Sequence, residues 1–201
     1  MLKSICFFTL VSFVLIVASS EAYAQDSTSS PKVSGWVDLS VENSDGETTV
    51  GGAKLLMSID ANLAGNDEVD LFMWAQTGPG YHQLYGGPTW TPSKYLSLGA
   101  GPGVERSGDK VSLRVGGYVY VGKDRFGNVF LFEFKGSGPW YKNQTSFNAG
   151  KGVTLSVVNQ RFAGTGPEVE YRIPKTKVAI RANALTQRGG TTTSVAVKFY
   201  F

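Results

Sequence analysis

The sequence contains one histidine, His82, and this is the first residue to consider for catalysis. A histidine that acts as a general base takes the proton of a nearby serine, and in a strand the position two residues on lies on the same face. That position holds Leu84. The spacing therefore predicts no enzyme, and a lipid-modifying enzyme that uses His82 is kept as an alternative.

The other residues that could bind a ligand argue against a metal, a cofactor or nucleic acid. Cys6 is the only cysteine and there is no second histidine, so a transition-metal site lacks its usual ligands. The run Gly99-Ala100-Gly101-Pro102-Gly103 lacks the third glycine of a dinucleotide-binding fingerprint. The net charge is only +3, and the Lys and Arg residues form no basic stripe. We expect no cofactor, no metal and no nucleic-acid partner.

Residues 1–24 have the pattern of a secretory signal peptide. Lys3 precedes an apolar stretch over residues 5–18, and Ala22-Tyr23-Ala24 forms a small-x-small cleavage site. The mature chain is expected to begin at about Gln25, with a short flexible tail over 25–31 and a single domain over 32–201. Cys6 lies within the signal peptide, so the exported chain is expected to carry no disulfide.

The composition excludes a disordered chain and a helical bundle. Of the 201 residues, 42% are hydrophobic, 17% are charged and 25 are glycine. A disordered chain needs low hydrophobicity and high net charge, and abundant glycine disfavours helices. The chain is therefore expected to fold through strands.

Apolar and polar residues alternate along most of the chain, which is typical of strands. For example, Val111, Leu113 and Val115 alternate with Ser112 and Arg114. Glycine, proline and asparagine turn signals separate these segments, and connections this short join antiparallel neighbours. The sequence predicts an all-β fold, an antiparallel up-and-down β-barrel of about 12 strands with a range of 10 to 12.

The last predicted strand ends on an aromatic residue. Val195, Val197, Phe199 and Phe201 share one face of it. This pattern resembles the C-terminal strand of Gram-negative outer-membrane β-barrel proteins, where it is the signal that the barrel-assembly machinery reads. The resemblance implies a transmembrane barrel in the cell outer membrane, with outer-membrane lipid and the assembly machinery as partners. Val197, Phe199 and Phe201 would form the assembly signal.

Aromatic residues near the predicted strand ends are expected to form the interfacial girdle of such a barrel. They are Trp74, Tyr81, Tyr85, Trp90, Trp140 and Tyr141. A soluble periplasmic ligand-binding β-barrel, which turns its apolar face inward, is the alternative at the level of the fold.

In a transmembrane barrel, the polar face of each strand lines the lumen. The predicted lumen-lining residues are Asp38, Lys54, Asp60, Arg114, Tyr118, Tyr120, Glu133, Lys135, Glu168, Glu170, Arg172, Arg181 and Lys198, and the same alternation turns Glu42, Asp70, Glu105 and Lys142 inward. The two signs of charge nearly balance, so weak ion selectivity is expected. Inward glycines at 99, 101, 103 and 116 either leave a narrow passage or receive the rings of Tyr118 and Tyr120.

These observations predict a narrow passive pore for small solutes. A closed barrel with a structural or assembly-accessory role is the second interpretation. The predicted loops are all short, so we expect neither a receptor surface nor a loop that folds inward to narrow the lumen.

Overall fold

The computed structural model describes residues 32–44, 47–60 and 68–201. The predicted signal peptide over 1–24 and the predicted tail over 25–31 lie outside these ranges. Among the described residues, no helix is long and apolar enough to cross a membrane.

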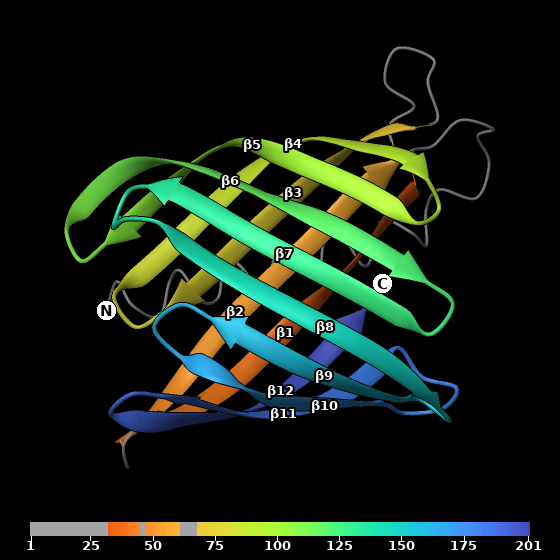
Figure 1. The fold of residues 1–201 in the computed structure, drawn as a ribbon. Coiled ribbons are helices and arrows are strands. Elements are labelled where there is room, and N and C mark those ends of the chain that lie inside the picture. Colours follow the sequence, from red (N-terminus) through yellow and green to blue (C-terminus); the bar gives the residue numbers. More distant parts are fainter. Residues whose placement is uncertain (1–31, 45–46, 61–67) are drawn as a thin grey trace.

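The described chain forms twelve antiparallel strands in one closed barrel, which confirms the predicted fold class and strand number (Figure 1). Each strand pairs with its neighbours in the sequence, and β1 pairs with β12. The strands are β1 (Lys32–Ser44), β2 (Glu47–Asp60), β3 (Val69–Gly78), β4 (Tyr81–Ser93), β5 (Leu96–Ser107), β6 (Lys110–Lys123), β7 (Phe126–Lys135), β8 (Trp140–Gly150), β9 (Val153–Gln160), β10 (Gly164–Arg172), β11 (Val178–Gln187) and β12 (Gly190–Tyr200).

The two ends of the strand series close the barrel. β1 and β12 pair continuously from Trp36 opposite Tyr200 to Ser44 opposite Thr192. Beyond the last strand, the N–H of Phe201 donates to the carbonyl of Gly35 at 3.2 Å, and the N–H of Gly35 donates back at 3.4 Å. Phe201 is therefore part of the seam.

The outer face of the barrel is apolar. Along β6, Leu113 is 75% exposed, while its neighbour Arg114 is buried inside the barrel. Other exposed outward residues include Leu39, Val41, Val104, Phe130, Phe134, Leu155, Val157, Ile180, Val195 and Val197. A soluble barrel places its apolar residues inside, whereas a barrel that meets lipid shows this inverted arrangement. The inverted arrangement disfavours the soluble alternative.

The barrel has two rims with different turns. The terminal rim is the one where Lys32 and Phe201 lie, and the far rim carries the turns β1–β2, β3–β4, β5–β6, β7–β8, β9–β10 and β11–β12. In an up-and-down barrel with an even number of strands, both ends of the strand series lie at one rim.

Candidate functional site

The first group of charges in the lumen is centred on Arg114 of β6. Its Nη2 lies 2.8 Å from Oε2 of Glu133 on β7, and its Nη1 forms an ion pair with Glu105 on β5. Gln83 and Tyr85 of β4 also donate to Glu133, at 3.0 and 3.3 Å. We call Arg114, Glu105 and Glu133 the Arg114 triad. All three side chains are buried, so the attraction between the guanidinium and the two carboxylates has to offset the cost of removing these charges from water.

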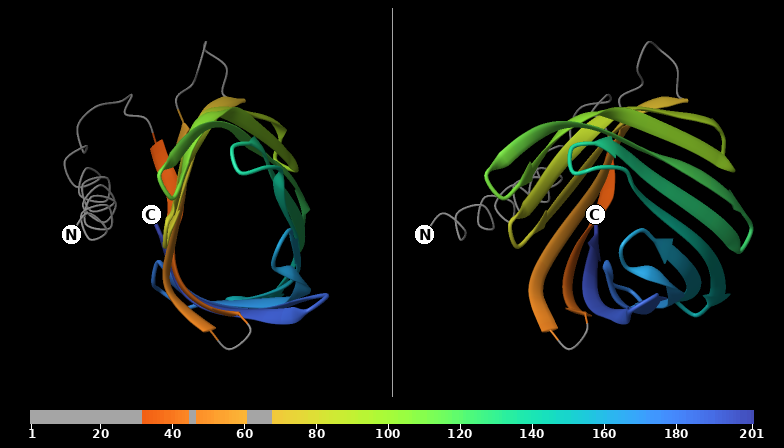
Figure 2. Two further views of the ribbon diagram at one scale, coloured as in Figure 1. Left: turned by 90° about the vertical axis from the view of Figure 1, so that its left-hand side faces the viewer. Right: turned by 60° about the vertical axis from the view of Figure 1, so that its left-hand side comes forward.

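The β7–β8 turn bends into the lumen and rests on this triad. The N–H of Ser137 donates to Oε1 of Glu105 at 2.9 Å. Gly136 has φ +60°, and a Cβ at this residue would lie 2.8 Å from both Arg114 and Glu105. The turn curls into the ring of strands in the left-hand view of Figure 2. The expectation that no loop folds inward is therefore wrong, because a short turn suffices when a buried carboxylate holds it.

The neighbouring β9–β10 turn also contributes to the interior at the far rim. Its Ala163 packs with Val158 of β9 and Leu185 of β11. Arg161 of the same turn donates to the carbonyl of Pro139 at 2.6 Å, which links it to the β7–β8 turn. The two turns together narrow this end of the barrel.

The second group of charges is centred on Arg181 of β11. Its Nη2 lies 2.8 Å from Asp38 on β1, and its Nη1 lies 2.9 Å from Glu168 on β10. Gln144 and Asn183 donate to Glu168 at 2.8 and 3.2 Å. We call Arg181, Asp38 and Glu168 the Arg181 triad. It repeats the arrangement of the Arg114 triad, with one guanidinium between two buried carboxylates.

A smaller polar cluster lies toward the terminal rim. Lys198 of β12 is 2.5 Å from Oε2 of Glu170 on β10, and the hydroxyl of Tyr200 donates to Oε1 of the same carboxylate at 2.5 Å. The guanidinium of Arg172 lies over the Tyr200 ring, 4.4 Å from its centroid. Glu170 therefore accepts both a lysine and a tyrosine, and these contacts join β10 to β12 across the inner face of β11.

Aromatic side chains fill one side of the lumen. Phe72 and Trp74 of β3 pack with Tyr85 of β4, and the ring of Phe72 lies edge-on to that of Tyr118 at 5.4 Å. We call these four residues the lumen aromatic core.

The inward glycines make room for this core. A Cβ at Gly99 would lie 2.5 Å from the ring of Tyr118, and one at Gly116 would lie 2.6 Å from the ring of Tyr85. Of the two alternatives for these glycines, the structure shows the filled one with Tyr118, but Tyr85 and Phe72 fill the space in place of Tyr120, which lies beside Gly122 and Gly127.

The aromatic girdle was predicted wrongly for four of its six members. Trp74 and Tyr85 belong to the lumen aromatic core, Tyr81 donates inward to Gln83, and Trp140 lines the lumen. Trp90 is 49% exposed and Tyr141 is 39% exposed, and both face outward. Proximity to a turn led to the prediction, whereas the alternation of the strand decides the face.

Four predicted lumen residues lie at the rims. Asp60 ends β2 and Arg172 ends β10 at the terminal rim, and both are exposed. Lys135 is exposed at the far end of β7, with φ +67° where the inward turn begins. The Tyr120 ring lies beside Gly122 and Gly127, near the terminal rim. These residues border the lumen and take no part in the two triads.

A cavity of about 210 Å³ lies between the lumen aromatic core and the Arg181 triad. Lys54, Lys142 and Lys198 line it together with Trp36, Trp74 and Trp140, and its other lining residues include Asp38, Glu168, Arg181, Gln144, Ser146, Gln160 and Leu131. Lys54 also pairs with Glu42 at 3.7 Å, and Glu168 is the main opposite charge acting on Lys142. The uncharged lining residues were missed at the sequence level, although alternation places them on the inner face.

His82 lies on the outer face of β4, near the far rim. Its Nδ1 is 2.6 Å from the hydroxyl oxygen of Thr77, its partner on β3. The neighbouring Gln83 points inward, so His82 faces away from the lumen. The lumen cavity therefore does not include the histidine of the enzyme alternative.

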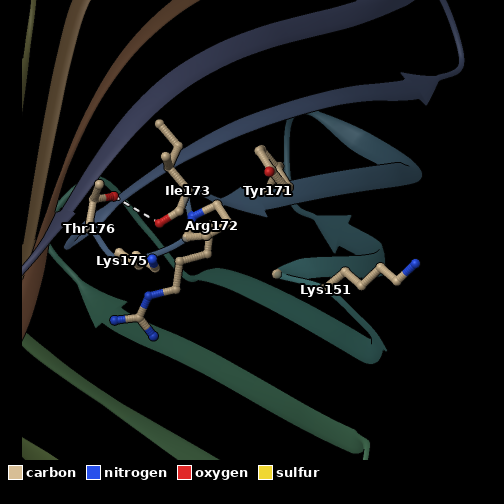
Figure 3. Close-up of a pocket in the computed structure, with 8 residues that line it drawn as sticks. Lys151, Tyr171, Arg172, Ile173, Lys175 and Thr176 are labelled. Carbon is tan, nitrogen blue, oxygen red and sulfur yellow. Dashed lines mark hydrogen bonds between the residues drawn. The ribbon is translucent and has the colours of Figure 1, made fainter.

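A second hollow, of about 580 Å³, lies at the terminal rim between the β8–β9 and β10–β11 turns. Lys151, Arg172 and Lys175 line it, but their side chains diverge (Figure 3). The Lys151 chain extends away from Lys175, and Arg172 stacks on Tyr200. The three cations do not converge on one point, so this hollow is not a focused anion site.

An apolar outer face, a closed ladder of strands and a charged, partly filled lumen define a β-barrel of the transmembrane class. Two solved structures have a similar fold, the KdgM porin and the "KdgM porin in complex with disordered oligogalacturonate". Each shares 14% sequence identity with this chain, covers 83% of this chain and 99% of its own, and has a TM-score of 0.57. At this identity the likeness concerns the fold alone. A variant of the Rh. blastica porin is more distant, with 10% identity, 86% and 100% coverage and a TM-score of 0.42. No family model matches the sequence, and no curated protein does.

Proposed function

We propose that this chain is an integral outer-membrane barrel that acts as a narrow passive pore for small solutes. The observation that carries the proposal is the cavity of about 210 Å³ inside the barrel, lined by lysines, amides and tryptophans. Eight strands enclose an interior that side chains just fill, and sixteen to eighteen leave a wide channel. Twelve strands with one wall lined by aromatic rings fit a passage between these limits.

The charges that line the passage support weak ion selectivity. Each triad holds one guanidinium and two carboxylates, which leaves one excess negative charge in each. Lys142 and Arg172 add two positive charges on the inner face and Asp70 adds one negative charge, while the pairs Lys198–Glu170 and Lys54–Glu42 are neutral, so the two signs nearly balance. A pore that selects one sign of ion lines its constriction with an excess of the opposite sign. The balanced lining lacks such an excess.

The structural neighbour that contains oligogalacturonate indicates one class of solute to test. Neutral and acidic short saccharides can both contact the tryptophans and lysines of this cavity through stacking and hydrogen bonds. We expect short saccharides to reduce the ion current through the pore when they enter the passage.

Single-channel recording tests the proposal. The refolded mature chain in a planar bilayer is expected to give stable conductance steps, with a cation-to-anion permeability ratio near one in a salt gradient. If folded, heat-modifiable protein gives no conductance steps, that result would contradict a pore and support the closed barrel. The closed barrel is the second candidate because the β7–β8 turn and the lumen aromatic core both occupy the interior.

Membrane extraction tests the location. An outer-membrane barrel is expected to remain in the membrane pellet until detergent is added. Release by salt or by osmotic shock alone would support a soluble periplasmic protein.

A further inference from the structure

The outer face of β7, β8 and β9 carries a group of polar side chains. Nδ2 of Asn128 on β7 donates to Oδ1 of Asn143 on β8 at 2.9 Å and to Oγ1 of Thr145 at 2.8 Å. Asn159 of β9 is the ladder partner of Asn143. We call Asn128, Asn143, Thr145 and Asn159 the amide patch. β7 and β8 lie toward the viewer in Figure 1.

Strand alternation shows that the patch faces outward. Asn128 lies on the same face of β7 as Phe126, which is 62% exposed, and Phe130. Asn143 shares its face of β8 with the exposed Tyr141, whereas the intervening Lys142 lines the lumen cavity. The polar side chains therefore occupy positions that elsewhere on the barrel meet lipid.

Apolar side chains lie on both sides of the patch along the strands. Toward the terminal rim, the rings of Phe126 and Phe147 are in contact at 4.9 Å. Toward the far rim, Phe130 stacks with Tyr141 at 6.4 Å. On β9, Val157 is 59% exposed beside Thr145. Asn128, Asn143 and Thr145 thus lie between apolar side chains, whereas Asn159 lies near the end of β9 at the far rim.

The hydrogen-bonding groups of the patch are only partly used. Asn128 donates its two amide hydrogens to Asn143 and Thr145. In the part of the chain that the structure describes, Oδ1 of Asn128 and Nδ2 of Asn143 have no hydrogen-bond partner. Acyl chains offer neither donors nor acceptors, and polar groups left unpaired in lipid are costly. The free groups are one acceptor and one donor on two hydrogen-bonded side chains of adjacent strands.

We propose that this face binds a second copy of the chain, related by a two-fold axis through the amide patch. In this arrangement Oδ1 of Asn128 accepts from the partner subunit's Asn143, and the same contact is made in reverse. An isologous interface requires such a self-complementary surface. Side-chain hydrogen bonds of this kind hold membrane-spanning segments together, where apolar contact alone does not distinguish a protein neighbour from lipid. The inference rests on the proposed membrane location.

Disulfide cross-linking in the membrane tests the interface. Cys6 is the only cysteine, so a Cys6→Ser background can carry one cysteine at a chosen position. Val157→Cys places a thiol next to the patch without changing it, and Leu113→Cys is the control on the outer face of β6. We expect a disulfide-linked dimer from Val157→Cys, and at least tenfold less dimer from Leu113→Cys.

A second comparison links the dimer to the patch itself. Adding Asn128→Leu and Asn143→Leu to Val157→Cys should lower the dimer yield at least tenfold. The barrel should stay folded in this variant, because leucine suits a lipid-facing site, and a retained heat-modifiable band on gels checks this. Sedimentation of the unaltered chain in detergent micelles should give the protein mass of a dimer.

The outcomes separate this inference from the proposed location. Any of three results overturns the two-fold interface. They are equal cross-linking at positions 157 and 113, a monomer mass in micelles, and a dimer that persists after both leucine substitutions. A Val157→Cys adduct with a different protein overturns it in favour of another partner. A monomer that is soluble without detergent contradicts the membrane location instead.

Discussion

The N–H of Ser137 donates a 2.9 Å hydrogen bond to Oε1 of Glu105, which lies two strands away on the inner wall of the barrel. Arg114, on the strand between them, pairs with Glu105 and donates to the Ser137 hydroxyl at 3.4 Å. Glu105 thus holds the β7–β8 turn through two hydrogen bonds from Ser137, and Arg114 adds longer contacts to the same turn. This anchor leads to the first prediction.

Replacing Glu105 with alanine should release the β7–β8 turn and raise the single-channel conductance. The change removes the acceptor for Ser137 and one of the two partners of Arg114, at a cost in unfolding free energy of about 1–3 kcal/mol. Recordings in a planar bilayer measure the conductance. Glu42→Ala is the control, since Glu42 lies near the same rim with its side chain 47% exposed. Equal conductance in both variants would show that the turn does not limit the passage.

Lys142→Glu should shift ion selectivity toward cations. Lys142 lines the lumen cavity, so the substitution reverses a charge where ions must pass. We expect the cation-to-anion permeability ratio to rise roughly twofold or more at 0.1 M salt, where the Debye length is about 10 Å. The reversal potential in a salt gradient reports the ratio. Lys175→Glu, in the β10–β11 turn outside the lumen, should leave it unchanged.

Gly99→Ala should destabilise the barrel. The new methyl group would lie 2.5 Å from the Tyr118 ring and 3.0 Å from both Phe72 and Thr89. Overpacking of this kind costs about 1–3 kcal/mol in unfolding free energy. Urea unfolding in detergent measures it. At Gly78, where nothing lies within 4 Å of a Cβ, alanine is the matched control, and a similar loss there would argue against a packed aromatic core.

Arg181→Met should be strongly destabilising because it leaves Asp38 and Glu168 buried without their shared cation. Removing one side of a buried ion pair costs about 3–5 kcal/mol. Combining the change with Asp38→Asn and Glu168→Gln should recover much of this loss, as measured by the same unfolding assay. No recovery in the triple variant would mean that the packing of Arg181 matters more than its charge.

Deleting Phe201 should reduce the amount of folded barrel in the membrane. The deletion removes both backbone hydrogen bonds to Gly35 and the ring that packs beside Val37, Leu55 and Met57 on the outer face of β1 and β2. The heat-modifiable band in the membrane fraction measures folded barrel. Phe162→Ala, at an exposed turn position, is the control for loss of an aromatic residue. Normal levels of the deletion variant would argue against a role for the last residue in assembly.

The fold could be predicted from the sequence because it is determined by one local pattern, the alternation of apolar and polar residues, which repeats in strand after strand. Alternation fixes which residues share a face, and short turns make sequence neighbours into ladder neighbours. The direction of the apolar face followed from the last strand, where Val197, Phe199 and Phe201 alternate with polar residues. Alternation likewise puts Arg114 and Glu133 on one face, and the structure joins them.

Contacts across the lumen could not be predicted from this alternation. Arg181 and Asp38 are separated by 143 residues, and nothing local specifies that they meet. The inward turn depends on a similar long-range contact, between Ser137 and Glu105. Trp74 and Tyr85 show the opposite case, because the alternation along β3 and β4 predicts their inward position, whereas their proximity to turns does not.

The seam between β1 and β12 makes completeness of synthesis a condition for closure. A chain that stops before Phe201 lacks the backbone groups that pair with Gly35, and a chain that stops before β12 exposes unpaired edges on both β1 and β11. Such edges pair readily with other chains. Closure therefore requires the whole of β12, and a product interrupted before that strand remains an open sheet with two unpaired edges.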